Sequence, residues 1–159
     1  MKDLLFSRYG DNALRILDGY NAQRPVTLRV NTLKTDIKSV KDSLSTVGIS
    51  FREVEWYDDA LIIERVREDI IKKLEIYNSG HIYLQSLSSM IPPLLLGARG
   101  DECILDMAAA PGGKTTQIAA LSSNKAQITA CEKDKIRAER LRYNIAKQGA
   151  RAYVMIADG

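Results

Sequence analysis

Apolar residues in the first 80 positions recur with periods that change between helical and strand-like. Residues 35–48 place Ile37, Val40, Leu44 and Val47 on one stripe with the spacing of a helix, which Gly48 ends. The other elements predicted in this half are helices at 11–20 and 67–77 and strands at 26–31, 50–56 and 60–64. The first half is therefore predicted to form a small α+β module.

From Asp101 onwards, compact apolar segments alternate regularly with helical ones. Strands are predicted at 102–107, 126–132 and 152–158, the first of them buried, with helices at 112–123 and 134–149. This order with short links predicts a parallel sheet whose faces are covered by helices. Residues 81–97 are predicted to form a short strand and a helical turn that Pro92 and Pro93 break, with a stop at Gly97.

The composition adds few constraints on function. With 45% hydrophobic and 27% charged residues the chain resembles an ordinary globular protein, and no apolar run approaches the ~20 residues of a membrane-spanning helix. The first residues lack the apolar core of a signal peptide, so a cytoplasmic location is expected. The net charge of +3 permits an acidic partner without requiring one. Cys103 and Cys131 lack metal-ligand spacing and are expected to be small buried residues.

A loop of small residues follows the first strand of the predicted parallel sheet. Its octet AAAPGGKT (108–115) ends like a nucleotide-binding P-loop, but Ala108 stands where that motif requires its first glycine. Asp106, at the end of the strand that leads into the loop, would repel a triphosphate and attract a cation. Both features disfavour a phosphate site.

Acidic residues end all three predicted parallel strands: Asp106, Glu132 and Asp158. Because ligands of such sheets bind outside the carboxyl ends of the strands, these residues and the loop are expected at one place. Glu132 is suited to accept both hydroxyls of a ribose, and Asp158 could accept the amine of an adenine. With a cation near Asp106, these groups describe S-adenosylmethionine, whose methionyl part would approach the bare loop backbone. Each acid alone could instead cap a turn or be surface charge.

The segment DMAAAPGGKTTQIA (106–119) resembles the cofactor-binding motif of the RNA (cytosine-5) methyltransferases of the Sun/Fmu type. Residues 28–36 look like that family's Arg-Val-Asn-Thr segment, residues 80–96 like its Gly-x-x-x-x-Gln-x-x-Ser-Ser segment, and residues 132–149 like its acid, Leu-x-x-Asn and Gly pattern. The resemblance implies an α/β protein of two parts. Residues 1–80 would be an α+β, RNA-contacting domain, and residues 81–159 the first half of a Rossmann-like methyltransferase domain with three parallel strands.

The resemblance also implies roles for single residues. The cofactor loop would consist of Ala109, Ala110, Pro111, Gly112, Gly113 and Lys114. Glu132 would bind the ribose, Arg137 would lie near the cofactor carboxylate or brace the site, and Asp158 would meet the adenine. No metal is implied. In the amino-terminal module, Arg29 is expected either to contact RNA phosphates or to lie on the surface paired with an acid.

In this family the reaction uses two cysteines, in Pro-Cys-Ser and Thr-Cys-Ser segments that this chain does not contain. The chain is therefore expected to be the front part of an enzyme that forms 5-methylcytosine in ribosomal or transfer RNA, and to be inactive alone. An exposed sheet edge would invite self-association. Two alternatives stay open: a non-catalytic module that binds S-adenosylmethionine or RNA, and, less favoured, a P-loop-like nucleotide-binding protein.

Overall fold

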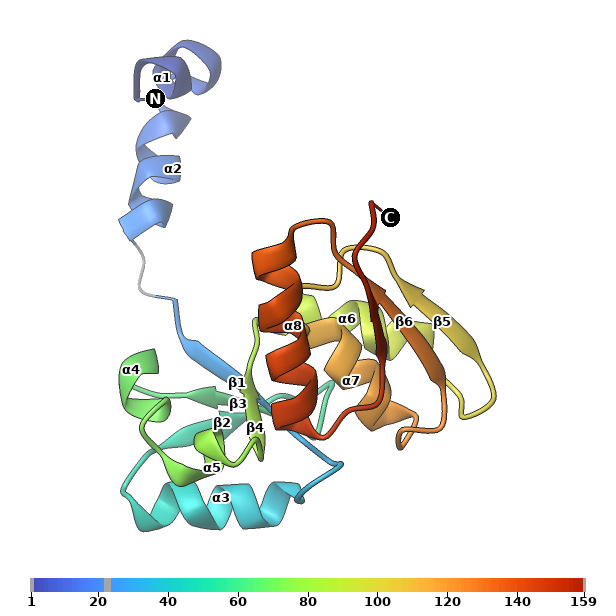
Figure 1. Ribbon diagram of the computed structural model, residues 1–159. Coiled ribbons are helices and arrows are strands. Elements are labelled where there is room, and N and C mark those ends of the chain that lie inside the picture. Colours follow the sequence, from blue (N-terminus) through green and yellow to red (C-terminus); the bar gives the residue numbers. More distant parts are fainter. Residues whose placement is uncertain (1, 22–23, 159) are drawn as a thin grey trace.

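The structure, a computed structural model, describes residues 2–21 and 24–158; residues 1, 22, 23 and 159, which fall within the two predicted domains, lie outside the described residues. Two helices, α1 (Lys2–Tyr9) and α2 (Asn12–Asn21), stand away from the rest of the molecule (Figure 1). Of these two helices, only α2 is predicted from the sequence. Helix α1 has no clear apolar stripe, which agrees with its burying none of its side chains. Within the described ranges no helix is long and apolar enough to cross a membrane.

The first module contains a four-stranded antiparallel sheet with the order β2-β3-β1-β4. Its elements are β1 (Val26–Val30), α3 (Ile37–Thr46), β2 (Phe51–Glu53), β3 (Ala60–Ile63), α4 (Glu68–Ile71), α5 (Glu75–Asn78) and β4 (Ile82–Leu84). Val40 and Leu44 of α3 pack into the core of this sheet, and the Asp36 side chain caps the helix by accepting a hydrogen bond from the Ser39 amide at 2.9 Å. The topology is that of a ferredoxin-like fold.

Two details of this module differ from the predicted pattern. Val47 is exposed at the end of α3, so the buried stripe stops at Leu44. The helix predicted at 67–77 is divided into α4 and α5. A continuous helix would turn Ile76 about 140° away from Ile71, whereas the break lets both side chains pack against the same core.

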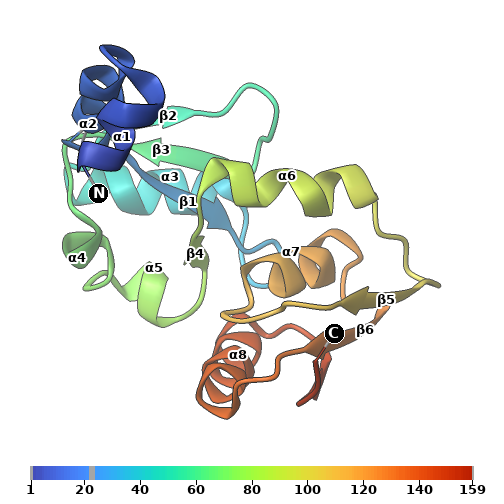
Figure 2. The ribbon, with the colours of Figure 1, turned by 90° about the horizontal axis from the view of Figure 1, so that it is seen from above.

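The second module is a parallel sheet with the order β5-β6-β7, as the alternation of strands and helices predicts. Its elements are α6 (Leu87–Leu96), β5 (Cys103–Asp106), α7 (Gly113–Leu121), β6 (Gln127–Cys131), α8 (Lys135–Gln148) and β7 (Tyr153–Met155). Helices α7 and α8 cover one face of the sheet, and α6 packs against α7 (Figures 1 and 2). The strand β4, which follows residue 80, pairs with β1 in the first sheet.

The opposite face of the parallel sheet is bare in the part of the chain that the structure describes. Leu105, Tyr153 and Met155 are exposed there, while the alternate residues Ile104 and Val154 pack against the helices. The prediction of a buried first strand is therefore wrong, as is the prediction of a buried Cys103, which is exposed. Cys131, on the central strand, is buried as expected. Self-association through an edge of this sheet stays a prediction.

Helix α6 continues through Pro92 and Pro93, which were predicted to break it. Pro93 has no amide proton, so the carbonyl of Ser89 one turn earlier loses its helical partner. The Nε2 amide of Gln85 donates a hydrogen bond to this carbonyl at 3.1 Å. The helix ends at Gly97 in the left-handed conformation (φ 59°), which confirms the predicted stop.

The two modules meet at a buried arginine. Arg29, on the central strand β1, has no exposed surface; its Nε donates to Gln85 Oε1 at 3.2 Å and its Nη2 to Thr116 Oγ1 of α7 at 3.1 Å. Burial lowers the pKa of the guanidinium. The expectation that Arg29 contacts RNA or lies on the surface is therefore wrong, because α7 lies against the face of the sheet from which Arg29 projects.

Glutamine side chains extend this junction into α6 and α7. Gln85 Nε2 also donates to Gln117 Oε1 at 2.9 Å, and Gln117 Nε2 donates to the carbonyl of Met90 at 2.9 Å. Both glutamines are buried. The polar groups at the junction of the modules are thus paired with one another, as buried polar groups must be.

Replacing Gln85 by leucine is expected to lower the free energy of unfolding by about 2–4 kcal/mol, because Arg29 Nε, the Ser89 carbonyl and Gln117 Oε1 would each lose a partner in the interior. The matched control is Gln148→Leu. Gln148 is also buried, but its side chain makes one hydrogen bond, to the Ile82 carbonyl, and its Oε1 has no partner among the described groups. The control should cost less than about 1 kcal/mol in urea unfolding. Equal losses would show that the junction is not held by Gln85.

Candidate functional site

The loop of small residues lies across the carboxyl edge of the parallel sheet. The amide of Ala109 donates to the carbonyl of Cys131 at the end of β6 (2.9 Å), and the amide of Gly112 closes a turn on the Ala109 carbonyl (2.8 Å). Gly112 has φ 109°, and a Cβ there would approach Leu141 Cδ1 of α8 to 3.1 Å. Glycine is therefore required at this position by the backbone and by the contact with α8, independently of any ligand.

The carbonyl of Pro111 is held by two side chains that are not among the predicted site residues. Asn144 Nδ2 of α8 donates to it at 2.7 Å, and Tyr83 Oη of β4 lies at 3.4 Å. Burial raises the pKa of Tyr83 to about 12, so its hydroxyl stays protonated and able to donate. Asn144 belongs to the Leu-x-x-Asn pattern that was noticed in the sequence, and its position three residues after the buried Leu141, on the same side of the helix, was the available signal.

Two of the predicted acids occupy defined positions at the same edge. Asp106 ends β5 in register with Ala130, and its Oδ2 accepts a hydrogen bond from Thr115 Oγ1 at 2.7 Å. Glu132 follows β6 directly, and its amide donates to the Met155 carbonyl of β7 at 3.1 Å. Its side chain is only 4% exposed. A carboxylate buried this far needs polar partners to remain charged.

Arg137 supplies the main partner of Glu132 and connects it to the loop. Its Nη1 lies 3.3 Å from Glu132 Oε2, and its Nη2 donates to the carbonyl of Ala110 at 3.1 Å. The start of α8 orients both groups: the Asp134 side chain caps the helix by accepting from the Arg137 amide at 2.8 Å, and the Asp134 amide donates to Glu132 Oε1 at 3.1 Å. The loop, the acid and the arginine thus form one hydrogen-bonded unit.

Lys114 and Asp158 are less tightly organised. Lys114 is exposed in the first turn of α7. Asp158 follows β7 at the same edge, with its side chain 81% exposed and 3.6 Å from Lys133 Nζ. Within residues 2–21 and 24–158, neither makes a hydrogen bond to the loop, to Glu132 or to Arg137. The roles of all nine predicted residues stay predictions.

Carboxylates dominate the chemistry of this edge. Asp106, Glu132 and Asp158 can accept hydrogen bonds from hydroxyls and amines, and Asp106, which has no base beside it within the described ranges, can attract a cation. Thr115, which would reach a metal-bound phosphate in a true P-loop, donates to Asp106 instead. No three potential metal-ligating side chains cluster within the described ranges.

Comparison with protein families gives two matches that together cover most of the chain. The model of the family described as "16S rRNA methyltransferase RsmB/F" matches residues 93–159. A second model, described as the RsmF/B-like ferredoxin-like domain, matches residues 1–68, in agreement with the topology of the first sheet.

Similar proteins include ribosomal RNA methyltransferases. The chain is 36% identical over 149 residues to the 25S rRNA (cytosine-C(5))-methyltransferase nop2 of Schizosaccharomyces pombe, covering 92% of this chain and 24% of that protein. It is 38% identical over 133 residues to the ribosomal RNA small subunit methyltransferase F of Escherichia coli O1:K1, covering 80% and 28%. The chain thus spans about a quarter of the length of these curated relatives.

Solved structures agree with this similarity. A methyltransferase homolog from Pyrococcus horikoshii shares 32% identity, with a TM-score of 0.84 over 98% of this chain and 51% of that one. NSun6 from the same organism, determined with SFG, shares the fold with a TM-score of 0.82 at 20% identity, covering 99% of this chain and 64% of that one.

Replacing Asn144 by leucine is expected to loosen the small-residue loop, because the Pro111 carbonyl would lose its 2.7 Å donor. Hydrogen exchange at the Gly112 amide should become about fivefold to tenfold faster, the scale of one lost hydrogen bond. Tyr83→Phe removes the 3.4 Å contact and the 3.5 Å hydrogen bond from Asn144 Nδ2 to Tyr83 Oη but keeps the 2.7 Å donor; it is the matched control and should change this exchange less. A larger effect of the tyrosine variant would reverse the assignment of the two donors.

Proposed function

We propose that this chain, which belongs to the RsmB/F family of RNA (cytosine-5) methyltransferases, holds S-adenosylmethionine at the carboxyl edge of its parallel sheet. The observation that carries the proposal is the buried carboxylate of Glu132, tied through Arg137 to the backbone of the small-residue loop. A carboxylate fixed in this way at the end of the second parallel strand is suited to bind a ribose.

The residues at this edge fit the cofactor. Each carboxylate oxygen has two acceptor positions. Oε1 of Glu132 uses both of them, for the Asp134 amide and Arg137 Nη1, whereas Oε2 contacts only Arg137 and can still accept from a ribose hydroxyl. Asp158 would accept from the adenine amine, and Asp106 would attract the sulfonium. When bound, S-adenosylmethionine supplies an electrophilic methyl group.

Arg137 acts in this proposal as a brace rather than as a direct ligand of the cofactor carboxylate. Both of its described contacts are internal, to Glu132 and to the Ala110 carbonyl. Its charge offsets that of the buried carboxylate, and its planar guanidinium fixes the distance between the acid and the loop. Ala109, Ala110, Pro111, Gly112, Gly113 and Lys114 would then present their backbone to the methionyl part.

We further propose that the whole protein methylates carbon 5 of cytosine in ribosomal or transfer RNA. Carbon 5 becomes nucleophilic when a thiolate adds to carbon 6; it then takes the methyl group, a base removes its proton, and the thiolate leaves. The two cysteines of this chain are poorly placed for the first step. Cys131 ends β6 beside the loop but its side chain is buried, and Cys103 begins β5, at the end remote from the loop.

The chain should bind S-adenosylmethionine more tightly than ATP with Mg²⁺ in calorimetric titrations. Glu132→Gln should weaken the binding of S-adenosylmethionine by about 1.5–3 kcal/mol, the scale of hydrogen bonds to a charged acceptor. Glu139→Gln is the matched control, because Glu139 is an exposed acid of α8 whose partner is Arg142. Tighter binding of ATP, or equal affinities for the parent and Glu132→Gln, would count against the proposal.

The 159 residues assayed alone with RNA and labelled S-adenosylmethionine should transfer no methyl group to cytosine. Cys103 lies at the opposite end of β5, and Cys131, which ends β6, is buried, so Cys103→Ser and Cys131→Ser should bind the cofactor like the parent and be equally inactive. Formation of 5-methylcytosine by the parent, abolished in Cys131→Ser, would contradict this assignment. Cofactor binding with no RNA binding would favour a non-catalytic cofactor module.

A further inference from the structure

Three hollows on the surface adjoin one another through shared lining residues. The first, of about 1120 Å³, lies at the start of β1 and the end of β3; the second, of about 260 Å³, adjoins β4; the third, of about 490 Å³, lies between the first module and α8. Arg24 lines the first and second, Leu84 the second and third, and Glu68 all three. We call the three together the basic groove. Its far end is lined by Pro111, within the small-residue loop.

The basic groove carries more positive charge than the chain as a whole. Seven basic and three acidic side chains line it, a surplus of four, whereas the net charge of the chain is +3. Each acid is paired with one base, in the ion pairs Arg52–Glu64, Arg67–Asp69 and Lys72–Glu68. Within the described ranges the remaining four bases have no carboxylate partner: Arg24, Arg65, Arg140 and Lys147.

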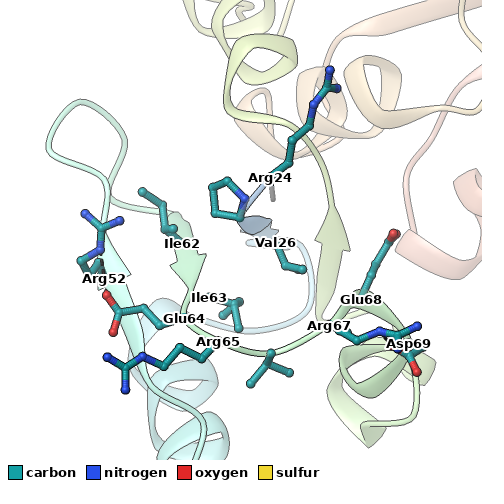
Figure 3. A pocket seen from close by; sticks show the side chains of 12 residues that line it. Arg24, Val26, Arg52, Ile62, Ile63, Glu64, Arg65, Arg67, Glu68 and Asp69 are labelled. Atoms are coloured by element: carbon teal, nitrogen blue, oxygen red, sulfur yellow. Dashed lines mark ion pairs between the residues drawn. The ribbon is translucent and has the colours of Figure 1, made fainter. Parts of the chain in front are cut away.

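Arginines form the rim of the first hollow. Figure 3 shows Arg24, Arg52 and Arg65 extending outward from three separate segments, with the aliphatic side chains of Val26 and Ile63 between them. Arg65 has φ 56°, a left-handed conformation that a non-glycine residue adopts at a cost. Guanidinium groups arranged along an open groove are suited to phosphates that follow one another along a strand.

Aromatic side chains line the third hollow beside its basic residues. Tyr77 and Tyr83 come from the first module, and Tyr143 comes from α8, where it is 64% exposed. Lys147 Nζ lies 3.8 Å from the centroid of the Tyr77 ring, a cation–π contact that fixes this ring. Lys147 Nζ also lies over the Tyr143 ring, but at 6.0 Å from its centroid, so this exposed ring keeps area for stacking at the end of the groove nearest the small-residue loop.

We propose that the basic groove binds a single strand of RNA, with its phosphates on Arg24 and Arg65 of the first hollow, which have no carboxylate partner within the described ranges, and a base stacked on Tyr143. This inference rests on the proposed function and names the path of the substrate. Alternating phosphates and flat bases match a groove that combines unpaired cations with aromatic rings, whereas an acidic peptide would use only the cations. Because the groove ends at Pro111, the strand is led toward the edge at which the cofactor is proposed to bind.

The test is the affinity of the 159-residue chain for a fluorescein-labelled, 12-nucleotide single-stranded RNA, measured by anisotropy over a series of salt concentrations. Tyr143→Ala should weaken binding about tenfold through lost stacking. Its control is Tyr153→Ala, because Tyr153 is 68% exposed but lies on the bare face of the sheet. Arg65→Gly should reduce the slope of log affinity against log salt concentration by about one, and glycine readily adopts the left-handed backbone conformation of this residue. Its control is Arg99→Gln, because Arg99 is an exposed arginine outside the groove.

Titration of S-adenosylmethionine with the same variants separates this inference from the proposed function. The proposed path would be supported if Tyr143→Ala and Arg65→Gly, but not their controls, bound RNA more weakly than the parent. All variants should bind S-adenosylmethionine with the affinity of the parent. Equal RNA affinities in the groove variants and their controls, or no RNA binding by the parent, would overturn it even if the cofactor still binds. Equal competition by polyglutamate and by unlabelled RNA would overturn it in favour of an acidic protein partner.

Discussion

A guanidinium removed from water at the junction of two sheets is the interaction on which the remainder of the structure depends. Among the residues that the structure describes, Arg29 has no carboxylate as a hydrogen-bond partner, so the cost of its desolvation is offset by neutral acceptors and by the ring of Tyr83, 5.9 Å away. One of those acceptors, Thr116 Oγ1, itself donates to the carbonyl of Gly112 at 2.8 Å. A single chain of hydrogen bonds therefore leads from the central strand of the first module to the small-residue loop.

This series of hydrogen bonds gives the first module a structural role in the second. A ferredoxin-like domain joined to a methyltransferase domain could simply be an additional binding domain, but here it supplies Arg29, Gln85 and Tyr83, whose contacts hold α7 and the Pro111 carbonyl in place. The acidic edge of the parallel sheet and the basic groove meet at this carbonyl. The two surfaces differ in their balance of charge, because bases outnumber acids by four in the groove, whereas three carboxylates lie at or just after the strand ends at the edge.

The sequence predicted those parts of the structure that depend on local spacing. The stripe of Val40 and Leu44 identifies α3, and the alternation of strands with helices makes the second sheet parallel, which brings Asp106 and Glu132 to one edge. Prediction from the sequence failed where the surroundings of a side chain are formed by residues distant in the sequence. Alternation in β1 places Arg29 on one face without saying that α7 covers it, and an apolar run at β5 does not reveal that one face of its sheet is bare. Asn144 was part of a noticed pattern, but its partner, a backbone carbonyl 33 residues earlier, carries no side-chain signal.

Pro93 links the formation of helix α6 to the association of the two modules. A helix normally completes its hydrogen bonds from its own backbone, but the Ser89 carbonyl depends on Gln85, whose other side-chain atom accepts from Arg29 of the first sheet. The hydrogen bond that replaces this missing helical bond of α6 is therefore part of the same network that joins β1 to α7. Folding of the two modules should accordingly be a single cooperative transition, in which the second module has no independently stable form with this helix intact.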